Sequence, residues 1–563
     1  MSIVFRSLFL SLAAVSLLGG SLVGQGEPAA AFTREFGRDG EPGSFRARFS
    51  RPGAGIVFLQ AMDHYVTLAA SREDTHGPED WLLLLENGSD HALRLFHEPR
   101  SAAFPADPAT AEWREEAVDG GVRFVLDGGA GLVLEKTLRH APEWRGFELE
   151  LALRNVSSAA VGDLQFTLAG PVLVNARESS LFGDVSVAIA APVEGEAQFV
   201  KPVPGQIQAL AVDPRALSFA GSTNRFFGAF LWPKDDAAAA ALTQFEVDTL
   251  PPRDNLDTRT YANTTTRVRY GLRLAVPQEG AATTITYGIY LGPKSYRVFD
   301  TLPEPDRFAP ILDVDLNPPC CGGITIPGGR PMAKVLLWLL GGFFDVLGNW
   351  GVAIILLTIL VRGAMSPLNF RMQKTMRAYG AKMAKLKPKL DELKRKHGDD
   401  QKAYQQAMIQ FQREHKIMPP LGGCLPIVLT MPIYIGLFTA LRTAYDLRQQ
   451  PFVGWIDDLS TSDALFQLGF WPGEFNLLPL LWIGLFLFLQ LRMPLPTDPQ
   501  QRQMQQIMRY MPVIFGVMLY NYASALLLYM VTSMLWSLVE SSLVKKVLGP
   551  VDPNVGAMAP TPM

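Results

Sequence analysis

Cysteine is scarce in this chain, and its scarcity limits the chemistry that the chain can support. The 563 residues include three cysteines, Cys320, Cys321 and Cys424. Three thiols are too few for the disulfide framework of a small secreted domain. No histidine follows them at a ligand spacing, and no Gly-x-x-x-x-Gly-Lys-Ser/Thr loop is present to hold nucleotide phosphates. We therefore expect no metal, no other cofactor and no bound nucleotide as an energy source.

The net charge of −3 hides an uneven distribution of charge along the chain. Residues 1–361 have a net charge of −11, whereas residues 362–416 carry fourteen Lys and Arg against five Asp and Glu. This division predicts an acidic soluble part joined to a membrane part with a basic loop. At the start, residues 1–26 combine Arg6 with an apolar run, which predicts a signal peptide or a retained transmembrane anchor. Under either interpretation, the part of the chain that follows is exported across the membrane.

Residues 27–316 show short runs of alternating apolar and polar residues separated by turn residues. Residues 121–126 and 132–138 flank a glycine-rich turn and predict a β-hairpin. Many such runs predict a large antiparallel β-sandwich, in which only the Ala-rich residues 236–242 favour a helix. Five histidines lie in this part without a nucleophile elbow or metal-ligand spacing. We therefore expect that the chain is not an enzyme, with a carbohydrate-binding or epimerase-like role as the alternative.

Long uncharged runs are confined to the second part of the chain, and one of them ends in a charge. Residues 317–348 predict a linker and an interfacial amphipathic helix with Lys334, Gly341 and Asp345 on one face. Residues 349–370 form the first predicted span, in which twelve uncharged residues precede Arg362. Twelve helical residues rise about 18 Å, so the guanidinium falls inside the roughly 30 Å hydrocarbon core. No acidic residue lies within a helical turn of Arg362 along the chain, so the arginine either snorkels or faces a wet cavity.

Residues 371–416 predict a basic helical hairpin on the cytoplasmic side. Apolar residues recur at spacings of four and three from Met372 to Leu393, and a shorter series follows His397. This pattern indicates a seam between two helices, although Pro388 should bend the first of them. The positive-inside rule accounts for the charge of the loop but not for the seam.

Further uncharged runs predict four more spans in residues 417–548, followed by a tail at 549–563. The predicted spans are residues 417–441, 475–493, 508–522 and 524–544. Residues 510–539 contain no charge, and as one helix they would place Lys545 and Lys546 outside. The polar residues 521–524 allow a turn there, which keeps both lysines inside. The predicted fold is therefore a polytopic α-helical domain with five spans after a large extracytoplasmic antiparallel β-sandwich.

Several motifs of this second part resemble the YidC–Oxa–Alb membrane protein insertases. Residues 349–367 resemble the family's arginine-bearing span, and residues 420–426 with 431–433 resemble its third span. Residues 447–452 and 455–460 resemble its external loop, and residues 510–515 its fifth span. Residues 290–294 resemble the end of the periplasmic sandwich of the Gram-negative type. The chain departs from the family at residues 523–525, where relatives often have Pro-Ser-Gly, and at Met530, where they have a second tyrosine.

The resemblance implies a hydrophilic, positively charged groove within the membrane that receives nascent inner-membrane proteins. Arg362 would supply the charge. The other proposed groove residues are Thr358, Thr430, Gln490, Tyr529 and Ser533. The basic hairpin would dock substrate, the ribosome or targeting factors. The other expected partners of the chain are the lipid bilayer and the Sec translocon. No contact with nucleic acid is expected apart from contact with the ribosome. The proposed docking residues of the hairpin are Met372, Met376, Met383, Lys385, Lys387, Lys394 and Arg395.

Two rival functions belong to other classes. A secondary transporter could also place an arginine in a cavity, but it would usually show internal repeats and paired broken helices, which this sequence lacks. A membrane-anchored carbohydrate-binding or epimerase-like protein would need its chemistry in the sandwich. The resemblance favours an insertase and chaperone of the bacterial inner membrane, with the sandwich in the periplasm and the hairpin and C-terminus in the cytoplasm.

Overall fold

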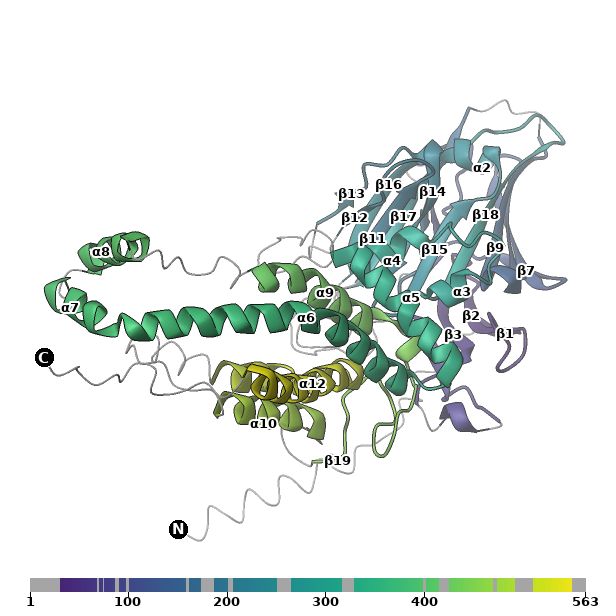
Figure 1. Ribbon diagram of the computed structural model, residues 1–563. Helices are drawn as coiled ribbons and strands as arrows, with labels where there is room; N and C mark the ends of the chain where they lie inside the picture. The colour runs from purple at the N-terminus through teal and green to yellow at the C-terminus, as the bar shows by residue number, and fades with distance from the viewer. Residues whose placement is uncertain are drawn as a thin grey trace, which may run out of the picture.

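The computed structural model consists of a β-rich part, up to residue 315, and a helical part, from residue 329 onward (Figure 1). It describes residues 31–548 apart from 68–69, 74, 87–90, 98–100, 158–161, 174–186, 201–205, 251–264, 316–328, 398–400, 415–424, 469–472 and 492–509. The expected N-terminal segment 1–26, the tail 549–563 and all three cysteines lie outside these residues. So does most of the expected linker.

A nine-stranded sheet forms the largest layer of the β-rich part. Its order is β12 (Gln198–Val200), β11 (Val187–Pro192), β14 (Leu217–Thr223), β15 (Phe227–Pro233), β18 (Ala282–Pro293), β9 (Gly146–Asn155), β8 (Leu132–Ala141), β7 (Gly121–Gly129) and β6 (Arg114–Val118). The predicted hairpin of residues 121–138 is confirmed as β7 and β8, which pair antiparallel from Gly121↔Arg139 to Gly129↔Leu132. Alternate side chains of β7 are buried, as expected for a strand that covers a core with one face.

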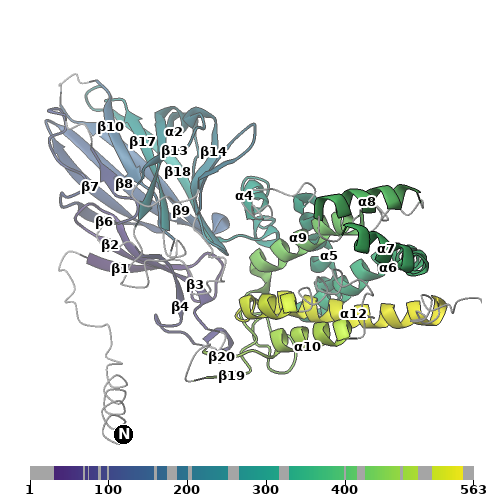
Figure 2. The same ribbon diagram turned by 90° about the vertical axis from the view of Figure 1, so that its left-hand side faces the viewer.

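Two smaller antiparallel sheets complete this part. One has the order β13 (Gln208–Ala209), β16 (Leu242–Leu250), β17 (Thr265–Leu274), β10 (Leu164–Ala169) and β5 (Leu95–Phe96). The other has the order β1 (Ala31–Phe36), β2 (Phe45–Ser50), β3 (Ile56–Tyr65) and β4 (Trp81–Glu86). A single cluster of buried apolar residues includes members of all three sheets, such as Phe49, Phe124 and Tyr270. The large domain is therefore β-rich with layered sheets (Figure 2).

Short helices close the β-rich part and lead out of it. The predicted helix at residues 236–242 is confirmed as α2 (Asp236–Ala241), which begins where the Asp235 carboxylate accepts a hydrogen bond from the Ala238 amide. The chain then leaves β18 through α3 (Tyr296–Phe299) and α4 (Ala309–Asp315). These helices bury Phe299 and Phe308 beside Tyr290. Phe308 also packs on Phe219, Phe230 and Trp232 of the nine-stranded sheet, so the cluster joins these short helices to that sheet.

The helical part consists of long apolar helices and a distal hairpin. Its helices are α5 (Gly329–Leu347), α6 (Trp350–Lys385), α7 (Lys387–His397), α8 (Gln401–Glu414), α9 (Leu425–Thr443), α10 (Leu477–Leu491) and α12 (Ser524–Leu548). Between α9 and α10 lie a 3₁₀ turn, Tyr445–Leu447, and the short strands β19 (Phe466–Gln467) and β20 (Glu474–Phe475). Residues 510–518 are also helical, and the helix ends before residues 519–523. The uncharged run at 510–539 is therefore broken near the predicted turn.

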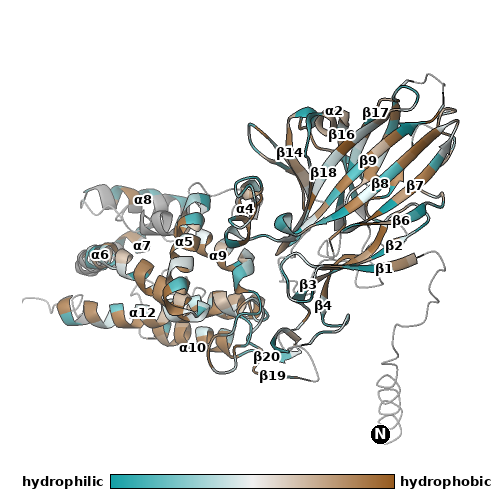
Figure 3. Ribbon diagram, turned by 90° about the vertical axis from the view of Figure 1, so that its right-hand side faces the viewer, coloured by the Kyte–Doolittle hydropathy of each residue, from teal (hydrophilic) through white to brown (hydrophobic). Residues whose placement is uncertain are grey.

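Two of the described helices are long and apolar enough to cross a membrane, namely residues 350–375 of α6 and 524–544 of α12. Helix α10 is apolar but shorter, and Figure 3 shows hydrophobic residues along α10 and α12. Helix α6 continues through Pro367 without a break and carries the first arm of the hairpin away from the β-rich part (Figure 1). The break in this arm comes at Leu386, two residues before the proline that was expected to bend it.

Polar contacts join the β-rich part to the loop that follows α9. Arg225, in the turn between β14 and β15, donates hydrogen bonds to the carbonyl oxygens of Arg442, at 2.9 Å, and Ser460, at 3.3 Å. In the opposite direction, Arg448 donates to the carbonyl oxygen of Tyr65 at 3.0 Å. Two arginines from different parts thus bind backbone carbonyls on the other side, which fixes the β-rich part against this loop.

Candidate functional site

Helix α6 begins at a side-chain cap and a packed aromatic pair, and these set its register. The Asn349 side chain accepts a hydrogen bond from the Val352 amide at 3.0 Å, which satisfies one of the free amides of the first turn. Trp350 stacks on Phe344 of α5 with ring centroids 4.1 Å apart, and the Arg297 guanidinium lies over both rings. This end of α6 is therefore anchored to α5 and the β-rich part. Arg362 lies twelve residues beyond Trp350, which is about 18 Å further along the helix.

Arg362 is half-buried and meets groups from two other helices. Its Nε donates a hydrogen bond to Ser533 Oγ of α12 at 3.3 Å, and its guanidinium lies 5.4 Å from the ring centroid of Tyr434 of α9. Tyr434 in turn meets Tyr529 of α12, which is buried, with centroids 6.4 Å apart. The structure therefore brings together Arg362, Ser533 and Tyr529, which sequence reasoning proposed, and adds Tyr434. The cation lies beside an aromatic face and a hydroxyl among apolar helices, and no acidic residue in the described part of the chain forms an ion pair with it.

A second set of polar groups follows on the same two helices. The Trp536 indole donates to Ser366 Oγ at 3.2 Å, and Ser366 donates to the backbone carbonyl of Arg362 at 3.0 Å. One further turn along, the Asn369 side chain lies beside Glu540, and the Glu540 carboxylate is within electrostatic range of Arg362. Sequence reasoning missed this acid because it searched only along the arginine's own helix. The available signal was the seven-residue spacing of Ser533 and Glu540, which places both on one face.

The remaining proposed groove residues are placed differently. Thr358 is fully buried, and its hydroxyl donates to the Ile354 carbonyl of its own helix at 2.7 Å. Its hydrogen bond is thus made inside α6 and not with Arg362. Gln490 is half-buried near the end of α10. The side chain of Thr430 lies outside the described residues.

The proposed docking hairpin is described mainly through its backbone. Met372 is half-buried on α6 and Arg395 is exposed on α7, where Lys396 pairs with Glu392 at 3.0 Å. The side chains of Met376, Met383, Lys385, Lys387 and Lys394 lie outside the described ones. Figure 2 shows α7 and α8 side by side at the end of the molecule away from the β-rich part.

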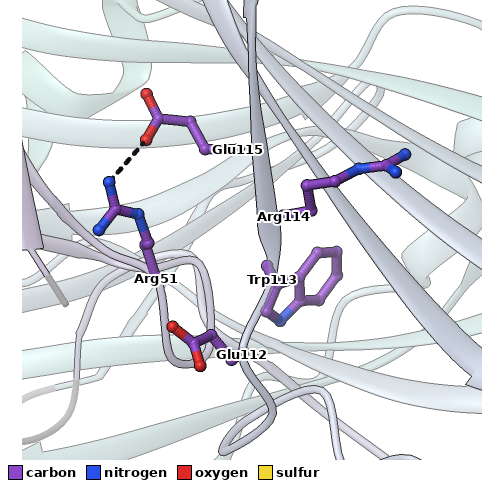
Figure 4. A pocket seen from close by; sticks show the side chains of 5 residues that line it. All are labelled: Arg51, Glu112, Trp113, Arg114 and Glu115. Atoms are coloured by element: carbon purple, nitrogen blue, oxygen red, sulfur yellow. Dashed lines mark ion pairs between the residues drawn. The ribbon is translucent and has the colours of Figure 1, made fainter.

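The β-rich part has a hollow on its described surface that is large enough to consider as a reaction site. The hollow of about 450 Å³ is lined by Arg51, Glu112, Trp113, Arg114 and Glu115 (Figure 4). Glu115 is paired with Arg51 at 3.6 Å, and the Trp113 side chain is buried, with its indole donating to the backbone. Among the residues that the structure describes, no group of three or more His, Cys, Asp and Glu could hold a metal ion. The hollow is a shallow polar surface braced by ion pairs.

The fold and the arginine cluster together define a class of protein. A β-rich domain is attached to apolar helices, two of them long enough to cross a membrane, and these helices hold a half-buried arginine between them. This combination is typical of a membrane protein with a polar site inside its helical part.

Comparison with known proteins gives the family. Residues 342–550 match the family model described as "60Kd inner membrane protein". "Membrane protein insertase YidC" of Neisseria meningitidis serogroup C (strain 053442) is 35% identical over 267 residues, which are 47% of this chain and 43% of the relative. The protein of the same name from Methylococcus capsulatus is 35% identical over 262 residues, 46% of this chain and 42% of the relative. Residues 342–550 are therefore similar to the YidC–Oxa–Alb family, the same family that the motifs of this part resemble.

The match spans less than half the length of these curated relatives. Among solved structures, "Active YidC insertase crystal structure with the first transmembrane domain resolved" aligns over 95% of this chain and 98% of that chain, with 15% identity and a TM-score of 0.33. The "galactosidase domain of alpha-galactosidase-sucrose kinase, AgaSK" aligns over 48% of this chain with a TM-score of 0.26. Scores this low carry no argument about function, for the sandwich or for the whole chain.

Proposed function

We propose that this chain is a membrane protein insertase and chaperone of the bacterial inner membrane. The observation that supports this most directly is the half-buried Arg362, held by Ser533 and Tyr434 between apolar helices. A cation in a low-dielectric wall creates a strong positive potential, which attracts acidic or polar residues of an incoming chain. Polar groups beside it lower the free-energy cost of bringing such a segment partway across the membrane.

The substrate in this mechanism is a nascent membrane protein. Its polar translocated segment enters the groove near Arg362, and its apolar segment leaves sideways into lipid. Burial of apolar surface in lipid supplies the driving force, so no nucleotide hydrolysis is required. In this proposal Tyr529, Thr430 and Gln490 contact the substrate from the other spans, and Thr358 stabilises α6 through its own backbone bond.

We also propose the membrane arrangement that this function needs. Five spans form the core, at residues 349–370, 417–441, 475–493, 508–522 and 524–544. The interfacial helix α5 supports this arrangement, because it buries Ala333, Leu336 and Leu340 and leaves Trp338 and Val346 exposed, as a helix lying on a lipid surface would. The net positive charge of residues 362–416 supports a hairpin in the cytoplasm and a β-rich domain in the periplasm.

The basic hairpin then lies where a nascent chain arrives. Its exposed Arg395 and the other docking residues named above would bind acidic surfaces of the ribosome, a targeting factor or the substrate. The chain would work alone or beside the Sec translocon. The contacts of Arg225 and Arg448 hold the sandwich against the loop after α9, which supports a bracing role for the periplasmic domain.

Reconstitution tests this function directly. The full-length chain in phosphatidylethanolamine and phosphatidylglycerol vesicles should integrate a single-span reporter peptide, measured as protection of its translocated end from added protease. Empty vesicles and vesicles with heat-inactivated chain are the controls. Integration no greater than in those controls contradicts the proposal. A secondary transporter would instead show solute flux without reporter integration.

A deletion separates the insertase from an anchored sandwich protein. Removing residues 34–290 leaves Ser295 and Arg297, which contact the helical part. An insertase should keep measurable integration of a small reporter, whereas a carbohydrate-binding or epimerase-like protein would lose all activity with its sandwich.

A further inference from the structure

The helices α6 and α12 run in the same direction and share a row of polar side chains. Both begin on the side of the β-rich part, where the Ser524 and Ala525 amides of α12 donate to the carbonyls of Thr461 and Leu459 at 2.6 and 2.9 Å. Along the row, Arg362 meets Ser533, Ser366 meets Trp536 and Asn369 meets Glu540. Seven residues separate the first and last members on each helix, a rise of about 10 Å. Glu540 therefore lies on the hairpin side of Arg362.

Glu540 has an incomplete set of partners. Asn369 lies beside its carboxylate, but the Oε1 atom is buried and has no hydrogen-bond partner among the described residues. A buried carboxylate oxygen without a donor is costly in free energy, so such an atom needs a reason to be kept. An unfolded polypeptide segment entering an apolar bundle brings backbone N–H groups that lack acceptors until the segment becomes helical. The Oε1 atom of Glu540 could therefore accept a hydrogen bond from a backbone N–H group of the entering segment.

We propose that Glu540 is a specificity-determining residue that sets which translocated segments the Arg362 site accepts. This proposal rests on the insertase function above. An acidic residue of the substrate is attracted by Arg362 and repelled by Glu540, whereas a basic residue experiences the reverse. Glu540 thereby weakens the preference of the site for acidic segments. Neutral segments pass with little electrostatic effect and are received through the free Oε1 atom.

The test uses three reporters that differ at one position. Single-span peptides carry Asp, Asn or Lys at the same place in the translocated segment, next to a photoreactive residue. The retained fraction is measured by cross-linking to the full-length chain in phosphatidylethanolamine and phosphatidylglycerol vesicles. Glu540→Gln removes the charge and keeps the shape. Asp457→Asn, on an exposed loop acid that pairs with Arg72 at 3.8 Å, removes an equal charge outside the site and is the matched control.

Glu540→Gln should increase retention of the Asp reporter about tenfold and decrease that of the Lys reporter by a similar factor. This is the size expected for one charge about 10 Å away at an effective dielectric constant near 20. The Asn reporter should change less than about twofold, and Asp457→Asn should change none of the three. Opposite signs for Asp and Lys distinguish an electrostatic effect from structural damage, which would move all three reporters together.

The proposal is overturned if Glu540→Gln retains the Asp reporter and the Lys reporter each to the same extent as the parent chain does. A change of the same sign in all three reporters overturns it as well. Failure of the proposed function looks different, because the parent chain would then not integrate the Asn reporter at all. A fluorescent fusion followed by size-exclusion chromatography checks that each variant folds. If Glu540→Gln does not fold, Glu540→Asp, which keeps the charge, should retain the three reporters as the parent does. A loss of the parent's charge preference in that variant counts against the proposal.

Discussion

The Ser295 hydroxyl lies 2.9 Å from both carboxylate oxygens of Asp446 and donates its hydrogen bond to that group. Ser295 follows β18 and caps α3, whereas Asp446 belongs to the turn after α9. The pair therefore joins two segments that are 151 residues apart. Burial raises the pKa of Asp446, and the hydrogen bond from Ser295 opposes that increase.

Ser295→Ala should weaken this junction, and more so as the pH rises. Because the folded pKa of Asp446 is raised, ionisation of the acid costs stability as the pH increases through that pKa. Without the serine the carboxylate loses a hydrogen bond to its charged form, worth about 1.5–3 kcal/mol. The stability lost in the variant should therefore be larger at pH 8 than at pH 4. Denaturant unfolding at both values measures it, and a pH-independent loss would contradict the assignment.

Lys136 gives a second pH dependence, inside the sandwich. It is fully buried, donates hydrogen bonds to the carbonyls of Ala54 and Leu93, and burial lowers its pKa to about 7. Between pH 7 and about 10 the unfolded chain binds one more proton than the folded chain, so stability rises with pH. Relative to Lys136→Met, the parent should gain about 1.4 kcal/mol per pH unit in this range. Unfolding of both proteins at pH 7, 8 and 9 tests this, and parallel curves would exclude a buried neutral lysine.

Two glycines of α6 form a matched pair for testing the packing of the helix start. A side-chain carbon at Gly351 would collide with the Phe452 ring, whereas at Gly363 its nearest neighbour is Trp536, 3.9 Å away. Gly351→Ala should lower stability by about 1–3 kcal/mol because the ring must move. Gly363→Ala should be neutral or raise stability by up to about 1 kcal/mol, the usual gain for alanine in a helix. Thermal unfolding in detergent compares them, and equal effects would mean that Phe452 does not pack there.

The sequence predicted those features whose cause is local. The hairpin at residues 121–138 follows from alternation and glycine turns, and α2 follows from an Ala-rich run after Asp235. The approximate site of the break before α12 follows from its polar residues. The sheet order and the contact of Arg225 with Ser460 could not be predicted from the sequence, because partners 235 residues apart leave no periodic signal in one sequence.

The arginine site shows the same limit at the scale of single side chains. The cost of a charge in an apolar run identified Arg362, and the motifs suggested Ser533 and Tyr529. Tyr434 and Glu540 were not found, because their role depends on how α9 and α12 rotate against α6. Thr358 stays a predicted groove residue, and the structure adds that its hydroxyl donates to the carbonyl of Ile354, four residues earlier in the same helix.

The central claim is that Arg362 acts through its positive charge. In cells depleted of their own insertase, Arg362→Lys should restore most integration of a single-span reporter with an acidic translocated segment. Arg362→Ala should restore little and Arg362→Glu least, with a loss of about tenfold or more for charge reversal. Variant amounts in the membrane are measured in parallel. That ranking supports a positive site for substrate, whereas equal integration by all three variants at equal amounts would remove Arg362 from the mechanism.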